Sequence, residues 1–264
     1  APGMSAASGP AWYAGFRWES APLSHWSWPL ASVVAYLLAT WGLSAAMRSR
    51  EAFELRRLTA LHNEFLSLGS LAMCAGTAAE LVRRHAQSGG LAWFFCEGAG
   101  VAAEGPLYFW SYVYYLSKYY EMLDTALVLL QKSRVPNFGL QVYHHAAVVV
   151  MAWLWLECRQ SLQWGGLLFN TFVHVVMYQY YACRVLGIPT PWKRWITKLQ
   201  IVQFVTSFFL LMGTLYLVSD RWARGDTCAG MGALLYNCLF NATLLLQFVG
   251  IDKRNSRQEE KKKG

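Results

Sequence analysis

The sequence has few charged residues for its length. Only 14% of its 264 residues are Asp, Glu, Lys or Arg, whereas 55% are hydrophobic and 16% are aromatic. A soluble domain carries about 25% charged residues, so this chain lacks the polar surface that contact with water requires. The scarcity of charge excludes an ordinary soluble protein and predicts that lipid is the solvent.

Cysteine pairs of the kind that bind zinc are absent as well. The chain has six cysteines and no CxxC motif, so no zinc site or other metal site is expected. The net charge of +8 suggests nucleic acid as a partner, but Lys and Arg lie mainly between apolar runs and near the C-terminal end. Cytoplasmic loops of membrane proteins show this distribution. We therefore expect no binding to nucleic acid.

What the sequence has instead is a series of long apolar runs. A run of about 20 residues crosses a hydrocarbon core of about 30 Å, and helices are the open-chain structure that lipid allows. Seven runs are long enough, at residues 28–47, 58–82, 106–131, 138–157, 163–184, 195–218 and 230–250. The predicted fold is an all-α integral membrane protein, a bundle of about seven transmembrane helices over residues 28–250. An N-terminal segment, 1–27, precedes it and a charged tail, 251–264, follows it.

Positive charge is distributed unevenly between the two ends of these predicted spans. Fifteen Lys and Arg fall on the side of the tail and six, Arg224 among them, on the other side. This asymmetry predicts a cytoplasmic C-terminus and a lumenal N-terminus. Cys96 and Cys228 then lie on the lumenal side, where disulfides persist, and a bridge between them is a hypothesis. The tail is expected to be solvated and disordered, and its Lys261 and Lys262 resemble the dilysine retrieval signal of endoplasmic reticulum membrane proteins.

Ionisable residues lie inside the third predicted span. Lys118, Glu121 and Asp124 follow one another at intervals of three, with Thr125 next to them, so they lie along one side of a helix and Lys118 can pair with Glu121. A charge inside a membrane costs at least about 2.5 kcal/mol, and such residues normally face a polar interior and mark a functional path. A salt bridge that only fixes helix packing is one alternative, and a misplaced span is another.

The fourth span carries two adjacent histidines. Gln141 and His145 fall on one helical face, and His144 lies beside them. A single histidine in an apolar helix is most often a hydrogen-bonded core residue. Two adjacent ones are harder to satisfy in that way, so we expect a functional site here.

Two further polar stripes follow. On the fifth span, one-turn intervals join Asn170, His174 and Tyr178, or Met177 and Tyr181. On the sixth, intervals of three join Thr197, Gln200 and Gln203. Four consecutive spans thus each offer a polar stripe, and we expect the stripes to converge on one buried cavity.

Taken in order, these boxes resemble the signature motifs of the long-chain fatty acid elongases. The match consists of Lys118-x-x-Glu121-x-x-Asp124-Thr125, Gln141-x-x-His144-His145, Asn170-x-x-x-His174-x-x-Met177-Tyr178-x-Tyr180-Tyr181 and Thr197-x-x-Gln200-x-x-Gln203. The resemblance implies a 3-ketoacyl-CoA synthase of the endoplasmic reticulum membrane. Such an enzyme condenses an acyl-CoA with malonyl-CoA and releases carbon dioxide and CoA, without a tightly bound cofactor. The resemblance also implies an acyl-chain tunnel in the bundle and ketoreductase, dehydratase and enoyl reductase partners, and it leaves a homodimer open.

The histidine box departs from the family pattern at its first position, where Gln141 stands in place of histidine. Glutamine there resembles the polyunsaturated fatty acid elongases of microalgae, including those that act on C18 chains with a Δ9 double bond. The resemblance therefore implies a C18 polyunsaturated acyl-CoA as the substrate.

The resemblance also implies roles for single residues. His144 is the nucleophile that takes the acyl group from CoA as an acyl-histidine. His174 is expected to polarise or protonate in the second half-reaction. His145 and Gln141 are expected to orient His144 and to donate hydrogen bonds toward developing oxyanions. Substrate-binding roles are expected for Lys118, Glu121, Asp124, Thr125, Asn170, Tyr178, Tyr181, Gln200, Gln203, Lys193 and Arg194.

The basic residues at the cytoplasmic side have two interpretations. A mouth formed by Lys132, Arg134, Lys193 and Arg194 would suit the phosphates of CoA. The same residues also fit the role of positive anchors at the ends of the spans. The sequence leaves both interpretations open.

Two other functions are weighed against the elongase. Membrane desaturases and hydroxylases share the His-x-x-His-His pattern, but they resemble one another in using about eight histidines in three boxes. This chain has six, and His25, His62 and His85 lie outside any box, too few remaining for two irons. A transporter with an ion path through the charged residues and histidines is the alternative that stays open. No paired interrupted spans, which favour that reading, are seen.

Overall fold

The computed structural model describes residues 10–135, 137–223 and 225–263. Three groups of residues discussed above lie outside this part. They are the first nine residues of the N-terminal segment, Arg224 among the predicted lumenal charges, and Gly264 after the lysines of the tail. The side chains of Lys261, Lys262 and Lys263 also lie outside the description.

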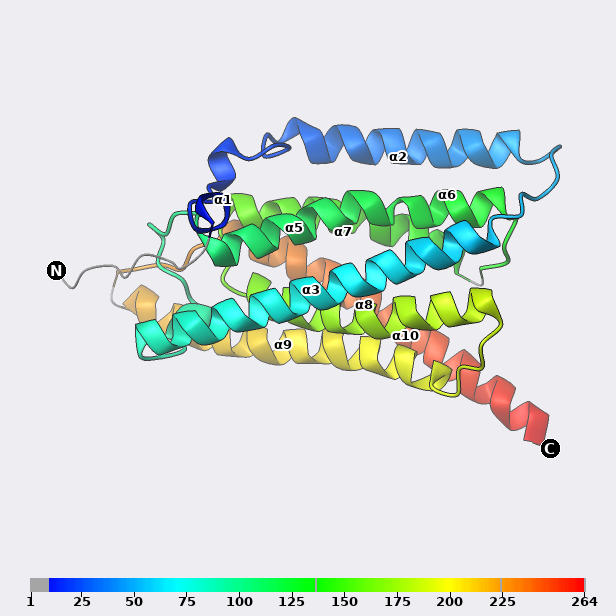
Figure 1. Cartoon of the computed structure of the whole chain (residues 1–264). Helices are drawn as coiled ribbons and strands as arrows, with labels where there is room; N and C mark the ends of the chain where they lie inside the picture. Colours follow the sequence, from blue (N-terminus) through cyan, green and yellow to red (C-terminus); the bar gives the residue numbers. More distant parts are fainter. Residues whose placement is uncertain (1–9, 136, 224, 264) are drawn as a thin grey trace.

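The described part of the chain is helical, without a β-strand. Its elements are α1 (Ala11–Ala14), the 3-10 helix η1 (Trp18–Ser20), α2 (Ser27–Ala46), α3 (Arg56–Ser88), α4 (Ala92–Phe95), α5 (Pro106–Glu121), α6 (Leu123–Leu130), α7 (Phe138–Glu157), α8 (Gln163–Leu186), α9 (Lys193–Ala223) and α10 (Met231–Lys263). The long helices lie side by side in alternating directions, and the two chain ends lie at opposite ends of the bundle (Figure 1).

Local sequence explains where several helices begin and end. α5 begins with Pro106, whose fixed φ suits the first helical position, after Gly105 at a φ of 84°. α3 ends at Ser88, and the next residue, Gly89, has a φ of 68° and donates its backbone N–H to the His85 carbonyl. Glycine adopts this left-handed conformation without a steric penalty, so it is the residue expected after a helix end.

The core of the bundle lies between α5, α7 and α8. Tyr114 of α5 and Trp155 of α7 stack with ring centroids 5.5 Å apart, and Tyr108 packs edge-on against Trp164 of α8. α3 packs along α8, while α9 contacts both α8 and α10. Large apolar side chains also cover the outside, for example Trp41 of α2, Phe209 of α9 and Leu246 of α10. In a membrane these side chains face lipid.

Five of the described helices are long and apolar enough to cross a membrane: α2, α3, α7, α9 and α10. α8 carries Asn170 and His174 within its length, which lowers its hydropathy. The predicted run 106–131 is not one helix, because the chain divides it into α5 and α6 at Met122. The bundle of membrane-spanning helices is confirmed, and the count of seven spans stays a prediction.

The charged tail is helical, which corrects the expectation of a disordered end. α10 continues to Lys263 and extends past the other helices (Figure 1). The sequence after Gly250 contains no proline and is rich in Lys, Glu, Gln and Arg, which are good helix formers. Arg254 also donates a hydrogen bond of 2.9 Å to Oδ1 of Asn137, which ties the tail to the start of α7.

A disulfide joins Cys96 and Cys228, which confirms the predicted bridge. Their Cα atoms are 5.1 Å apart, and 132 positions separate them in the sequence. The backbone N–H of Ala229 donates to the carbonyl of Glu97 beside the bridge. The disulfide therefore fastens the segment after α4 to the segment before α10, at the end of the bundle opposite to the C-terminus (Figure 1).

Removal of this bridge should destabilise the protein. A disulfide restricts the unfolded chain and typically contributes about 2–4 kcal/mol, so Cys228→Ser should lower the unfolding temperature in detergent. Cys158→Ser is the matched control, since Cys158 is a free thiol near the same end. Alkylation of both Cys96 and Cys228 without prior reduction would contradict the bridge.

Candidate active site

The site is built around a lysine that the bundle buries completely. Lys118 of α5 is 0% exposed, and its Nζ donates to Oε1 of Glu121 at 2.7 Å, one helical turn away. Nζ also donates to Oδ1 of Asn170 at 3.3 Å and lies 4.0 Å from the centre of the Tyr114 ring. The predicted Lys118–Glu121 pair is confirmed, and it lies inside the bundle rather than on its surface.

Glu121 brings a histidine of α8 to this ion pair. Nδ1 of His174 is 3.6 Å from Oε1 of Glu121. The same carboxylate oxygen accepts a hydrogen bond of 3.1 Å from the Ser117 hydroxyl. The other oxygen, Oε2, has no hydrogen-bond partner among the described residues. Glu121 is therefore the link between the buried lysine and His174.

Two hydrogen bonds fix the orientation of the Asn170 side chain. Its Oδ1 accepts from the Tyr114 hydroxyl at 2.9 Å and from Lys118 at 3.3 Å. Both donors require the oxygen on that side, so the amide nitrogen points elsewhere. Asn170 also lines the cavity described below, and its amide nitrogen donates no hydrogen bond in the described part of the chain.

A second cluster surrounds Asp124, at the start of α6. Its Oδ2 accepts a hydrogen bond of 2.8 Å from the Tyr178 hydroxyl, and Nε2 of His145 is 3.7 Å from the same oxygen. Nε2 of His62 is 2.7 Å from the other oxygen, Oδ1. Asp124 thus joins side chains from α3, α7 and α8.

Gln141 was expected to orient His144, but its side chain contacts Thr125 instead. Its Nε2 donates to the Thr125 hydroxyl at 3.5 Å, and that hydroxyl also bonds Tyr36 at 2.7 Å. No hydrogen bond between Gln141 and either neighbouring histidine occurs in the described structure. Gln141 therefore connects α7 to α6 and α2, and a direct orienting contact with His144 is not seen.

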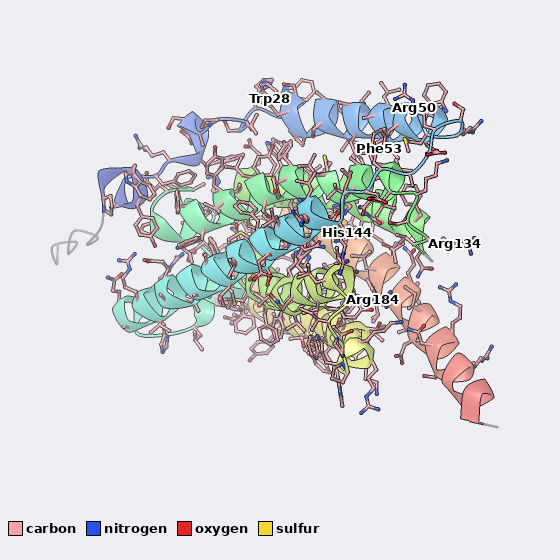
Figure 2. The ribbon with its side chains drawn as sticks, turned by 45° about the vertical axis from the view of Figure 1, so that its right-hand side comes forward. Trp28, Arg50, Phe53, Arg134, His144 and Arg184 are labelled. Carbon is pink, nitrogen blue, oxygen red and sulfur yellow. A yellow bond between two sulfur atoms is a disulfide. The ribbon has the colours of Figure 1, made fainter. Side chains whose placement is uncertain are left out.

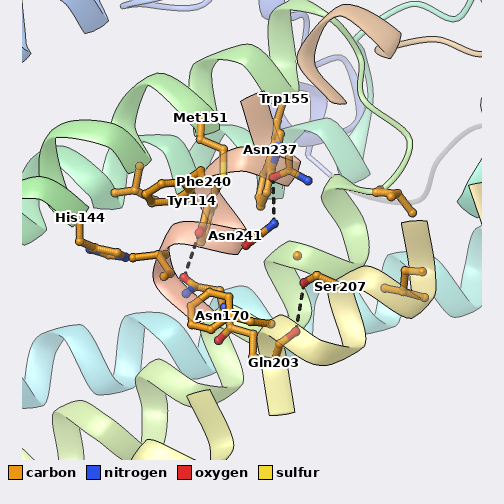
Figure 3. Close-up of a pocket in the computed structure, with 16 residues that line it drawn as sticks. Tyr114, His144, Met151, Trp155, Asn170, Gln203, Ser207, Asn237, Phe240 and Asn241 are labelled. Atoms are coloured by element: carbon orange, nitrogen blue, oxygen red, sulfur yellow. Dashed lines mark hydrogen bonds between the residues drawn. The ribbon is translucent and has the colours of Figure 1, made fainter. Parts of the chain in front are cut away.

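A cavity lies between α5, α7, α8, α9 and α10, with His144 on its wall. Figure 3 shows His144 at one end, Ser207 toward the other and Asn241 between them. Its apolar lining includes Val148, Met151, Trp155, Leu210 and Leu244, and its polar lining consists of His144, Asn170, Gln203, Ser207, Asn237 and Asn241. His144 forms no hydrogen bond in the described structure. Both of its imidazole nitrogens are therefore without a hydrogen bond to another described residue.

The predicted residues thus divide into groups. His144, Asn170 and Gln203 line the cavity, whereas His145 and His174 are buried beside it. Gln200 bonds the sulfur of Met177 at 3.7 Å. Tyr181 is 42% exposed, so the structure does not place it in the interior, although its ring is 6.1 Å from that of Tyr178. At this turn of α8 Tyr180, Ala182 and Cys183 are buried, so the face that carries them packs inside.

The predicted basic mouth has a different composition in the structure. Lys132 and Arg134 line an open depression together with Arg48 of the segment after α2. Lys193 and Arg194 are exposed at the start of α9 and do not line it. Figure 2 shows Arg50, Arg134 and Arg184 at one end of the molecule, with His144 further inside. Sequence reasoning missed Arg48 because it counted this residue only as a span anchor.

Several polar partners of the site were not predicted. His62 was treated as lying outside any motif, yet an ionisable residue in the apolar run 58–82 was a usable signal. Tyr114 and Ser117 precede Lys118 by four residues and one, and Tyr36 lies in the first long helix. Asn237 and Asn241 are one turn apart on α10, which is itself a polar stripe that the sequence shows. No group of three or more His, Cys, Asp or Glu is placed to hold a metal ion within residues 10–135, 137–223 and 225–263.

Comparison with known proteins decides the family. The profile of the ELO: GNS1/SUR4 family matches residues 21–263. The chain belongs to the ELO family. The match includes every residue of the two clusters and of the cavity, so the resemblance noted in the motifs is confirmed at the level of the family.

Curated relatives of this ELO protein carry elongase names. The chain is 32% identical over 251 residues to fatty acid elongase sre1 of Dictyostelium discoideum, which covers 94% of this chain and 92% of the relative. It is 29% identical to fatty acid elongase 3-like of Arabidopsis thaliana, over 89% of this chain and 85% of the relative. It is 36% identical to very long chain fatty acid elongase 5 of Mus musculus, over 65% of this chain and 58% of the relative.

Replacing one partner of the buried ion pair of this ELO protein should lower the stability more than replacing both partners. Lys118→Met leaves the Glu121 carboxylate buried without its cation, at a cost of about 3–5 kcal/mol. The double variant Lys118→Met/Glu121→Leu should be more stable than the single one, as measured by thermal unfolding in detergent.

The exposed pair Arg17–Glu104, whose side chains are 72% and 49% exposed, is the control. Water screens such a pair, so Arg17→Met should change the unfolding temperature little. A double variant that is less stable than Lys118→Met would contradict the buried-pair interpretation.

Proposed function

We propose that the protein is a fatty acid elongase that condenses an acyl-CoA with malonyl-CoA to 3-ketoacyl-CoA, carbon dioxide and CoA. One observation carries the proposal. An unbonded histidine, His144, lies on the wall of a largely apolar cavity in a chain of the ELO family. A nucleophile at the side of an apolar cavity suits a substrate with a reactive thioester and a long hydrocarbon tail.

The first half-reaction transfers the acyl group to the protein. The unprotonated imidazole nitrogen of His144 attacks the thioester carbonyl, and the C–S bond then breaks, with CoA leaving as the thiolate. The carbonyl oxygen carries negative charge in between. The N–H groups of Asn170, which its two hydrogen bonds direct away from Lys118, lie on the same cavity and suit this oxyanion. The product of this step is an acyl-histidine.

The second half-reaction forms the new carbon–carbon bond. Malonyl-CoA loses its carboxylate as carbon dioxide, and the resulting carbanion attacks the acyl carbonyl and displaces the His144 nitrogen. His174, held 3.6 Å from Glu121, polarises or protonates during this step. Burial supports the step, because water near the carbanion would protonate it first.

Charge at one end of the bundle suits the CoA portion of both substrates. Arg48, Lys132 and Arg134 line one depression, and guanidinium groups bind phosphate oxygens through paired hydrogen bonds. This end is proposed to be cytoplasmic, with the disulfide at the lumenal end, in an endoplasmic reticulum membrane. The Cys96–Cys228 bridge supports that orientation, because disulfides persist in the oxidising lumen.

The condensation itself needs no bound cofactor, since it neither consumes nor produces reducing equivalents. Reduction, dehydration and a second reduction of the 3-ketoacyl product require the ketoreductase, dehydratase and enoyl reductase partners named above. A homodimer remains part of the proposal. The three partner enzymes and the homodimer are proposed from the family resemblance alone.

The preferred acyl chain is proposed to be a C18 polyunsaturated one. The cavity wall carries amide groups among its apolar side chains, and a saturated acyl chain offers these groups no hydrogen-bond acceptor. The Gln203 side chain forms no hydrogen bond in the described structure, and Asn241 bonds only Asn237, at a long 3.5 Å. A cis double bond offers a π face that accepts a weak hydrogen bond from an amide N–H. The lining therefore supports an unsaturated tail.

The condensation can be tested in membranes from cells that express the chain. Membranes receive radiolabelled malonyl-CoA and a panel of C16 to C20 acyl-CoAs. The native chain should form 3-ketoacyl products, whereas His144→Ala should fall to the level of empty membranes because no nucleophile remains. His85→Ala is the control at the exposed end of α3. A correctly folded native chain that releases no carbon dioxide from malonyl-CoA would refute the proposal and favour transport.

The chain preference has a separate test. Asn241→Leu should lower the ratio of kcat/KM for polyunsaturated over saturated C18 acyl-CoA by about two- to fivefold, the value of one weak N–H···π contact. Thr243→Val, on the exposed face of the same helix, should leave the ratio unchanged. An unchanged ratio in Asn241→Leu would exclude the amide lining as the source of preference.

A further inference from the structure

His62 is an ionisable residue in an apolar helix, and none of the sequence motifs includes it. It lies on α3 and is 5% exposed. Its Nε2 donates to Oδ1 of Asp124 at 2.7 Å. Its ring stacks on Tyr120 of α5, with centroids 5.0 Å apart and an angle of 28° between the planes. Contacts on the edge and on the face hold the imidazole in one orientation.

The two oxygens of Asp124 have different neighbours. Oδ1 accepts from His62, while Oδ2 accepts from the Tyr178 hydroxyl at 2.8 Å and lies 3.7 Å from Nε2 of His145. The planar carboxylate turns as a unit, so a donor on one oxygen also sets the direction of the other. His62 therefore determines where Oδ2 lies relative to the histidine box.

The Asp124 carboxylate also lies beside His145 of the histidine box. Its Nδ1 is buried and has no hydrogen-bond partner among the described residues. Oδ2 of Asp124 lies 3.7 Å from its other nitrogen, and such contacts are often long before substrate binds. A carboxylate beside an imidazole selects one tautomer and one ring orientation. The ring of His145 packs edge-on against that of His144, with centroids 5.3 Å apart.

We propose that His62 is a positioning residue, which acts on His145 and Tyr178 through Asp124. The proposal rests on the elongase function, because it gives His62 a part in the condensation without contact to substrate. A simple packing contact between α3 and α6 is the alternative, and it predicts effects on stability alone.

Two substitutions separate these interpretations. His62→Phe keeps a planar ring against Tyr120 but removes the N–H donor, and His62→Gln keeps an N–H donor. For the purified full chain, His62→Phe should lower kcat of condensation about 10- to 100-fold, the usual range for groups that orient a reactive side chain. KM should change less than about threefold, because no substrate contact is lost.

The kinetic experiment also includes a conservative variant, His62→Gln, and a control, His85→Phe. His62→Gln should recover most of kcat, and His85→Phe, which lies on the same helix at its exposed end, should behave as the native chain. If kcat of His62→Phe falls only in proportion to the amount of folded protein, or if His62→Gln is as slow as His62→Phe, the positioning role is refuted.

A second experiment measures unfolding temperatures and needs no substrate, so its result does not depend on the elongase function. His62→Phe and Tyr178→Phe remove two donors from one carboxylate, so their shifts in unfolding temperature should not add in the native background. In an Asp124→Ala background, which offers neither donor a side-chain acceptor, the two shifts should add. Additive shifts in both backgrounds would overturn the proposal, whether or not the native chain condenses malonyl-CoA. A native chain without condensation but with the expected coupling would refute the elongase function alone.

Discussion

A charge inside an apolar bundle is stable only where other polar groups of the same bundle surround it, and this constraint arranges the centre of the molecule. Lys118 and Glu121 are 0% and 1% exposed, and a single charge at such a depth costs about 2.5–3.5 kcal/mol on insertion scales. Their pairing removes part of that cost. Lys118 also donates to Asn170 and packs against the Tyr114 ring, and Glu121 accepts a hydrogen bond from Ser117. The rest of the site follows from these contacts.

The rotation of α8 is the first consequence. Because Asn170 must face Lys118, residues one and two turns later on the same face also point toward α5 and α6. His174 thus reaches Glu121, and Tyr178 reaches Asp124. The interruption at Met122 places Asp124 at the start of a new helix, where it serves a separate set of partners from those of Glu121. One helix face therefore supplies three residues to two carboxylate clusters.

Contacts within one helical period were predictable from the sequence, and contacts between helices were not. The spacing of Lys118 and Glu121 predicted that they pair, and they do. The distribution of charge placed Cys96 and Cys228 on the same side of the membrane, and a disulfide joins them. His62 and Tyr36 reach the site from helices outside the four predicted stripes, and their partners Asp124 and Thr125 lie on another helix, so the packing of the helices identifies these contacts. Tyr181 shows the converse. It belongs to the predicted stripe, but α8 buries Tyr180 and Cys183 against its neighbours at that turn.

The polar centre also explains why such a bundle keeps buried charges at all. Replacement of a buried ion pair by well-packed apolar residues is often neutral or stabilising, so stability alone does not account for Lys118 and Glu121. Their effect on Asn170 does. Lys118 and Tyr114 occupy the oxygen of its amide and so turn the nitrogen away from them, and Asn170 lines the same cavity as His144. An apolar centre would hold the helices together equally well, but it would leave that amide without its two donors and free to turn, and the proposed oxyanion donor would lose its fixed direction.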